Sequence, residues 1–217
     1  HLDHSGMLPR LYHEGFRGTI YCTRATAELL DVMLHDSVGL YLRDLERTNL
    51  RNARRGRPSI EPVFDMEDVE EVLGLCSGHG FKEHVSVGQA ATLVFHDAGH
   101  ILGSCVVELW AQEDGLERKI VFSGDLGQYD TPILRDPEPI DEADLVLMES
   151  TYGGRRHRSR EKTLEELGDI CTSERSRRGN ILIPAFSIGR SQEILYQLGK
   201  HYEEWEIDRY RVFLDSP

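Results

Sequence analysis

The sequence has no long hydrophobic run and few cysteines. Nowhere in the 217 residues do the roughly 18 consecutive apolar residues of a membrane span occur, which excludes an obvious transmembrane helix. The first residues also lack the basic and then apolar pattern of a secretory leader. No CxxC pair is present, which argues against a thiolate zinc site and a disulfide framework; the four widely spaced cysteines are Cys22, Cys76, Cys105 and Cys171. We therefore expect a soluble, cytoplasmic protein with reduced thiols and no membrane partner.

Positive charge is also scarce. Lys and Arg number 25 against 38 Asp and Glu, so the formal net charge is −13. Such a chain repels nucleic acid at long range, which argues against a general nucleic-acid coat protein. Two local basic segments, RNARRGR at 51–57 and RRHRSR at 155–160, are still able to contact a polyanion. The length and the 39% apolar content allow one large domain, or one domain plus part of another.

The hydrophobic periodicity predicts a mixed α/β chain. Helices are expected at about 5–13, 24–35, 65–75, 160–176 and 190–204. Strands are expected at about 18–23, 90–100, 104–110, 118–125, 143–150, 180–186 and 210–215, with a hairpin across 111–117. The polar stretch 41–62 is predicted to be a surface excursion, and the strand at 143–150 to be buried. The helix and strand alternation after this strand predicts parallel βαβ packing.

Metal-ligating side chains gather at three places. The opening HLDHSG carries His1, Asp3 and His4 within four residues, and imidazole and carboxylate are ligands of zinc-class metals. His100 in HDAGHILGS and Asp125 in FSGDLG each follow a predicted strand, among small residues that allow close backbone approach. Rigid strands fix ligands placed at their ends, so these residues predict a metal site. Locally, an ordinary structural role for the first histidines remains open.

These segments, taken in order, resemble a known family. HLDH, AGHILGS and SGDLG are similar to motifs of the metallo-β-lactamase superfamily, and ESTYGGRRH and IPAFSIGRSQE are similar to motifs of its β-CASP branch. That branch comprises nucleic-acid-processing metallohydrolases, including the endonuclease subunit of the pre-mRNA cleavage and polyadenylation machinery. The resemblance implies an α/β fold, with a partial αββα sandwich at 1–153 that lacks its N-terminal strands. A truncated first part of a β-CASP domain would follow at 154–217.

The resemblance also implies roles for particular residues. It implies two zinc ions, the first held by His1 and His100 and the second by Asp3 and His4, with Asp125 bridging both. Asp3 and Glu149 would be the catalytic residues. Glu149 would orient a metal-ligating histidine, and a helix cap at the end of a strand is its alternative role. A further ligand histidine is expected two residues before His1 and two more histidines after Pro217, so we expect a fragment that holds part of the site and is inactive alone.

The function implied by the resemblance is hydrolysis of RNA phosphodiester bonds in RNA processing or decay. A hydroxide shared by the two metals would attack, while Asp3 takes or orients its proton. Single-stranded RNA would lie between the two domains, and the protein would act as a homodimer or as a subunit of a processing complex. Three alternatives stay open: small-molecule ester or thioester hydrolysis by the same metals, a metal-free scaffold subunit, and DNA as substrate.

Three other residues admit simpler interpretations. His96 is expected to be a structural hydrogen-bonding residue, and His157 a surface histidine in a basic loop. Arg190, at the turn that follows IPAF, has two open interpretations of equal weight. It would either meet a phosphate at a helix N-terminus or form an ion pair within a packing turn.

Overall fold

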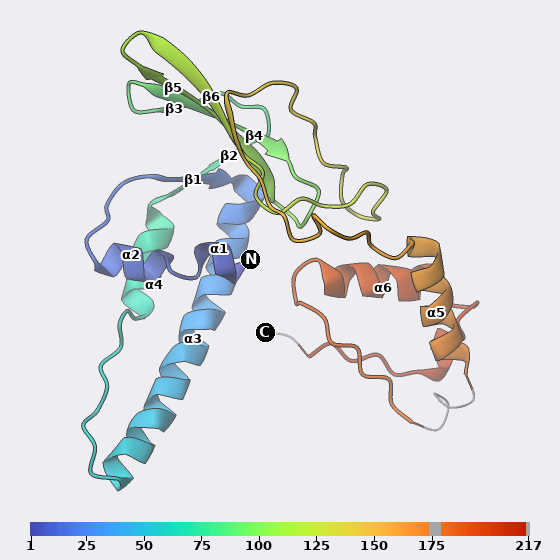
Figure 1. Cartoon of the computed structure of the whole chain (residues 1–217). Coiled ribbons are helices and arrows are strands. Elements are labelled where there is room, and N and C mark those ends of the chain that lie inside the picture. Colours follow the sequence, from blue (N-terminus) through green and yellow to red (C-terminus); the bar gives the residue numbers. More distant parts are fainter. Residues whose placement is uncertain (174–178, 216–217) are drawn as a thin grey trace.

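The computed structural model describes residues 1–173 and 179–215 (Figure 1). The helices are α1 (Leu2–Ser5), α2 (Leu8–His13), α3 (Arg24–Arg54), α4 (Met66–Gly74), α5 (Arg160–Thr172), α6 (Arg190–Lys200) and a 3-10 turn (Ile207–Arg209). The strands are β1 (Ile20–Thr23), β2 (Cys76–His79), β3 (Val85–Val87), β4 (Ala91–Asp97), β5 (Cys105–Glu113), β6 (Leu116–Phe122) and β7 (Leu145–Leu147). The chain is therefore a mixed α/β structure, as its periodicity predicts.

The larger sheet has the strand order β3-β4-β5-β6-β7 and is antiparallel except for β7, which runs parallel to β6. The predicted hairpin between β5 and β6 is confirmed. Its two turn residues, Asp114 and Gly115, have φ angles of +53° and +75°, the left-handed pair that matches the twist of the flanking strands. β1 and β2 form a separate parallel pair, and α3 and α4 lie between them in the sequence.

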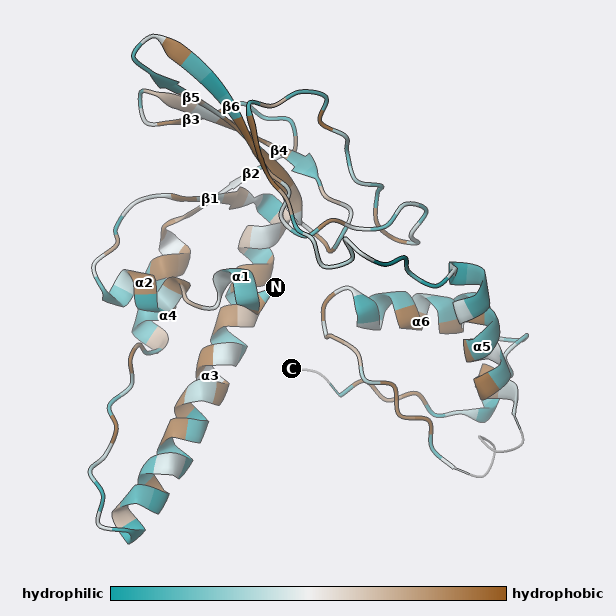
Figure 2. Cartoon of the chain, in the orientation of Figure 1, coloured by the Kyte–Doolittle hydropathy of each residue, from teal (hydrophilic) through white to brown (hydrophobic). Residues whose placement is uncertain are grey.

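The helical core forms where α3 meets α4. Leu30, Leu34 and Val38 recur every four residues on one side of α3, and they pack against Val69 and Val72 of α4. All five are at most 4% exposed. Figure 2 shows the hydrophobic residues recurring along α3 and concentrated in the strands of the larger sheet. None of the described helices combines the length and the apolar content that a membrane crossing requires.

The first half of the chain differs from prediction in four places, one of which is the strand β3 at Val85–Val87, which the sequence did not predict. The helix predicted at 24–35 continues to Arg54, so much of the predicted excursion at 41–62 is helical. No proline interrupts this stretch, and Gly56, with φ +65°, follows the helix end. Residues 76–79, predicted only to end a helix, pair with β1 as a strand. The helix predicted at 5–13 is two short helices, α1 and α2.

The last part of the chain differs more. β7 forms, but its residues are 47–54% exposed, so the prediction of a buried strand is wrong. The strands predicted at 180–186 and 210–215 are irregular, and the expected βαβ packing does not form among the described residues. A strand needs a partner for its backbone groups, and neither segment has one here. α5 and α6 instead surround a small core of Trp205, Cys171 and Ile207. The predicted helix residues 174–176 lie outside the described residues.

A buried polar network ties the larger sheet to the segment after it. His96 lies 2.8 Å from the Glu108 carboxylate through Nε2 and 3.2 Å from the Glu138 carboxylate through Nδ1. Lys119 Nζ lies 2.5 Å from the second oxygen of Glu108, and Lys82 pairs with Glu138 at 3.0 Å. The predicted structural role of His96 is thereby confirmed. The network attaches the long segment between β6 and β7 to the face of the sheet.

Truncating Leu34 tests the helical core. Leu34 is fully buried between α3 and α4, so Leu34→Ala is expected to lower the free energy of unfolding by about 3 kcal/mol, from lost burial and the cavity left behind. Leu40→Ala on the same helix is the matched control, because Leu40 is 50% exposed. Denaturant titration of both variants measures the difference. Equal losses would contradict the assigned core.

Glu108 gives the polar network a pH dependence. Burial alone raises the pKa of Glu108, but hydrogen bonds from Lys119 and His96 outweigh it and leave the pKa below the ordinary 4.5. Because the pKa of Glu108 is lower in the folded state, the ionised carboxylate stabilises the fold at pH values above its ordinary pKa. This stabilisation is lost as the pH falls through the lowered pKa of the folded state. Glu108→Gln is therefore expected to flatten the acid side of the stability–pH curve. Glu113→Gln, on the exposed end of β5, should leave that slope unchanged.

Candidate metal centre

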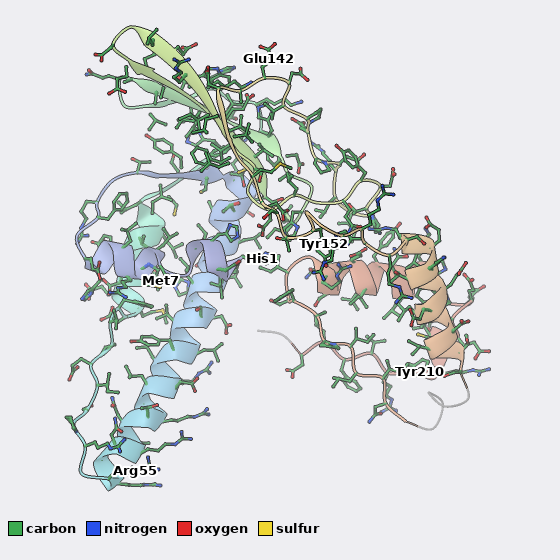
Figure 3. All side chains as sticks on the ribbon, viewed as in Figure 1. His1, Met7, Arg55, Glu142, Tyr152 and Tyr210 are labelled. Carbon is green, nitrogen blue, oxygen red and sulfur yellow. The ribbon has the colours of Figure 1, made fainter. Side chains whose placement is uncertain are left out.

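The N-terminal residues form one side of the site. Residues Leu2–Ser5 form the short helix α1, and the backbone N–H of His4 donates to the carbonyl of His1. This turn brings His4 Nε2 to 3.4 Å from the Asp3 carboxylate and to 3.4 Å from the Asp125 carboxylate. Figure 3 shows His1 beside the upper part of α3, close to the loops that leave the larger sheet.

The loop after β4 carries His100. Its shape is set by Ser104, whose Oγ accepts hydrogen bonds from the backbone N–H groups of His100 and Ile101. The hydroxyls of Thr23 and Thr26 then donate to the Gly103 carbonyl, at 2.8 and 3.0 Å. A side chain at Gly103 would collide with both threonines. The loop is thus fixed against the first turn of α3.

The segment after β6 carries Asp125. Ser123 Oγ accepts a hydrogen bond from the backbone of Glu149, and the Glu149 carboxylate accepts one from the backbone of Leu126 at 2.8 Å. Two residues past Asp125, the backbone N–H of Gly127 donates to the carbonyl of Ala98 in the His100 loop, also at 2.8 Å. The two loops therefore meet backbone to backbone.

These contacts bring three of the five predicted metal ligands together, His1, His100 and Asp125, with His4 beside Asp125. One ligand atom from each of His1, His100 and Asp125 lies within 4.8 Å of the other two. His100 Nε2 is 3.7 Å from the Asp125 carboxylate, and the rings of His1 and His100 meet edge to face at 5.4 Å. Asp3 is the most exposed member, with 72% of its side chain accessible, and it joins the group through His4. Metal binding by this cluster remains a prediction.

The cluster opens on a cavity of about 220 Å³. Its polar wall is made by His1, His4, His100 and Asp125, and its apolar wall belongs largely to α3. The α3 residues in that wall are Thr26, Leu29, Leu30 and Met33. An opening of this kind leaves one side of the cluster accessible to a small group or to one phosphodiester of a longer ligand.

Glu149 supports the Asp125 segment. The hydrogen bond from the Leu126 N–H is the main cause of its lowered pKa; burial opposes it, while Thr151 and the nearby His100 add to the lowering. Among the described residues, no hydrogen bond joins Glu149 to a histidine. The ionised carboxylate holds the backbone next to Asp125, and its predicted role toward a metal-ligating histidine stays a prediction.

Two predictions outside the cluster are settled by contacts. Arg190 forms an ion pair with Glu193 at 2.6 Å within the turn that starts α6, so the packing-turn interpretation holds. His157 is exposed and lies against the ring of Tyr152, as expected for a surface histidine. The sequence interpretation missed Ser104 and Ser123. The sequence marks them only as small polar residues beside a strand: Ser104 directly precedes β5, and Ser123 directly follows β6.

Comparisons with known proteins point to two kinds of curated protein, a ribonuclease and transcription termination factors. Ribonuclease TTHA0252 of Thermus thermophilus is 42% identical over 217 residues, which cover all of this chain and 44% of that protein. Transcription termination factor FttA is 31% identical in both Methanothermobacter thermautotrophicus and Thermococcus kodakarensis, over 32% and 31% of those proteins. The chain thus spans under half of the ribonuclease and about a third of the termination factors. No family model matches the chain.

The contact between the two loops is testable at Gly127. A Cβ at this position would overlap the carbonyl of Gly99, so Gly127→Ala must push the His100 and Asp125 loops apart. We expect a loss of about 2 kcal/mol or more in the free energy of unfolding, together with weaker zinc binding in a titration. Gly154→Ala is the control, because nothing lies within 4 Å of its added Cβ. Zinc affinity unchanged by Gly127→Ala would contradict this arrangement.

Proposed function

We propose that this chain forms part of a zinc-dependent ribonuclease of the metallo-β-lactamase superfamily, in its β-CASP branch. The observation that carries the proposal is the convergence of His1, His100 and Asp125 within 4.8 Å, in a chain 42% identical to a protein named ribonuclease. The proposed domains are a metallo-β-lactamase core at 1–153 and the first part of a β-CASP domain at 154–217. The separate core around Trp205 supports this division.

The donor set fits zinc. Imidazole nitrogen and carboxylate oxygen are both ordinary zinc ligands, and the three donors come from three separately anchored segments. In the proposed centre His1 and His100 would hold one ion, Asp3 and His4 would hold the second, and Asp125 would be a ligand of both. Zinc bound there would act as a Lewis acid that neutralises charge on phosphoryl oxygens and lowers the pKa of water at the site.

The chain's own residues supply positioning and proton transfer. Asp3 has an exposed carboxylate 3.4 Å from His4, and we assign it the role of accepting or orienting the proton of the attacking water. Glu149 holds the Asp125 segment through the N–H of Leu126, which keeps the bridging carboxylate in place. The accessible cavity beside them would admit a phosphodiester of single-stranded RNA.

Removing the ligands tests the proposal. In the full-length protein, Asp125→Ala and His100→Ala are expected to lose bound zinc, and these variants and Asp3→Ala are expected to cleave single-stranded RNA at least about 100-fold more slowly. Zinc content by mass spectrometry and cleavage of a labelled oligonucleotide measure the two effects. His157→Ala is the control, since His157 is exposed and outside the cluster.

Three results would contradict the proposed function. Unchanged RNA cleavage by Asp125→Ala would exclude this cluster as the active centre. A folded wild-type protein that binds no zinc would favour a scaffold subunit. Faster turnover of a thioester than of RNA would favour a small-molecule hydrolase on the same metal pair.

A further inference from the structure

The C-terminal half of α3 carries three arginines that have no ion-pair partner among the described residues. Arg43, Arg51 and Arg54 are exposed, and none makes an ion pair or a side-chain hydrogen bond with the described residues. Arg47, between them, reaches only Asp44, at 3.4 Å and fully on the surface. In a chain of net charge −13, acidic partners are abundant, and several arginines elsewhere are paired with them. Examples are the pairs Arg10–Glu14, Arg118–Asp144 and Arg158–Glu166.

The register of α3 aligns these arginines with the candidate metal centre. Five turns of an α-helix take 18 residues, so residues 18 apart lie on the same side of the helix, about 27 Å apart along its axis. Leu29 and Met33 line the cavity of the metal centre, and the residues 18 positions later are Arg47 and Arg51. Arg43 and Arg54 follow the same spacing of three or four residues and fall on the same side.

The alignment holds only if α3 is one uninterrupted helix. α3 runs as one 31-residue helix from Arg24 to Arg54, and Figure 1 shows it leading directly away from the loops of the site. On the side that joins the cavity to the arginines, the acidic residues are Asp36 and Asp44, and Asp44 lies next to Arg47. The result is a basic stripe, composed of Arg43, Arg47, Arg51 and Arg54, that begins at a fixed distance from the cavity.

We propose that this basic stripe binds the phosphate backbone of the single-stranded RNA whose reacting phosphodiester lies in the metal centre. The inference rests on the proposed function and extends it to the substrate path. Guanidinium groups bind phosphate oxygens in pairs of hydrogen bonds, and each phosphate neutralised releases counterions. At the 3.4 Å spacing of a stacked strand, 27 Å corresponds to roughly eight nucleotides. Arg43, at the start of the stripe, is ten residues past Met33, about 15 Å or roughly four nucleotides, so RNA of about five nucleotides reaches its first arginine and only RNA longer than about eight reaches Arg51.

The chemistry of α3 favours RNA over an anionic membrane. An interfacial membrane helix presents a broad apolar face beside its basic one. In α3 the apolar residues Leu30, Leu34 and Val38 are buried against α4, so that face is already covered. Of the exposed apolar residues near the stripe, Leu50 lines an apolar groove with Leu45 and Ile60, and Leu40 lies ten residues before it on the helix. Apolar side chains beside arginines suit a strand with alternating phosphates and bases.

Two matched triple variants of the full-length protein test the proposal, each removing three positive charges. The test variant is Arg43→Gln, Arg51→Gln and Arg54→Gln; the control is Arg10→Gln, Arg118→Gln and Arg209→Gln, whose arginines are ion-paired. Glutamine keeps a good helix propensity, and circular dichroism checks the fold. Both triples are made in an Asp125→Asn background, so that RNA binding is measured by fluorescence anisotropy without cleavage.

The expected result is specific to long RNA. For single-stranded RNA of roughly 20 nucleotides, the slope of log affinity against log salt should become about 2 shallower in the test triple, at about 0.7 per lost contact. The control triple should keep the wild-type slope, and a tetranucleotide should bind all three proteins alike. Equal slopes in the two triples would overturn the proposal, and so would an equal loss for the tetranucleotide.

Further readouts separate the alternatives. If the test triple loses binding to phosphatidylserine-containing vesicles while its RNA binding is unchanged, the stripe is a membrane surface and the proposal is wrong. If the slope changes as expected but the wild-type protein cleaves no RNA, the stripe is upheld as an RNA-binding surface and the proposed function fails. Each proposal is thus tested on its own measurement.

Discussion

The backbone contact between the loop at 98–104 and the segment at 123–127 decides where His100 and Asp125 lie relative to each other. The N–H of Gly127 donates to the carbonyl of Ala98, and the two loops approach so closely that a Cβ at Gly127 would overlap the carbonyl of Gly99. The contact brings His100 beside Asp125, and His4 then reaches Asp125 from the N-terminal helix. A shift of either loop would separate a nitrogen ligand from the shared carboxylate.

The same loop also connects the helical core to the larger sheet. Through the Gly103 carbonyl it accepts hydrogen bonds from Thr23 and Thr26, which begin α3, while its two ends continue β4 and β5 of the larger sheet. The helical core and the sheet therefore share one short segment. Because that segment also carries His100, the packing of α3 on α4 and the position of a candidate ligand depend on each other.

Local signals predicted the strands that precede His100 and Asp125 better than they predicted the rest of the fold. His100 and Asp125 follow strands whose alternation is plain in the sequence, and the turn at Asp114 and Gly115 is a strong hairpin signal. What failed needed information from elsewhere in the chain. β2 forms because β1 offers it a partner, whereas 180–186 and 210–215 have strand-like sequences without one. Phe186 instead lies 5.8 Å from the ring of His1, a contact between residues far apart in sequence.

Because residues 41–54 belong to α3, their arginines have fixed positions, which they would not have in an irregular surface segment at 41–62. In a flexible segment, the arginines would have no fixed direction relative to the cavity, and their charge would only add to solvation. A continuous helix gives each side chain a defined side and a defined distance. In an acidic molecule, a positive stripe of fixed direction also orients the approach of a polyanion, because the net negative charge of the rest of the molecule repels it. On the proposed function, a single long helix would therefore both line the centre and direct the strand toward it.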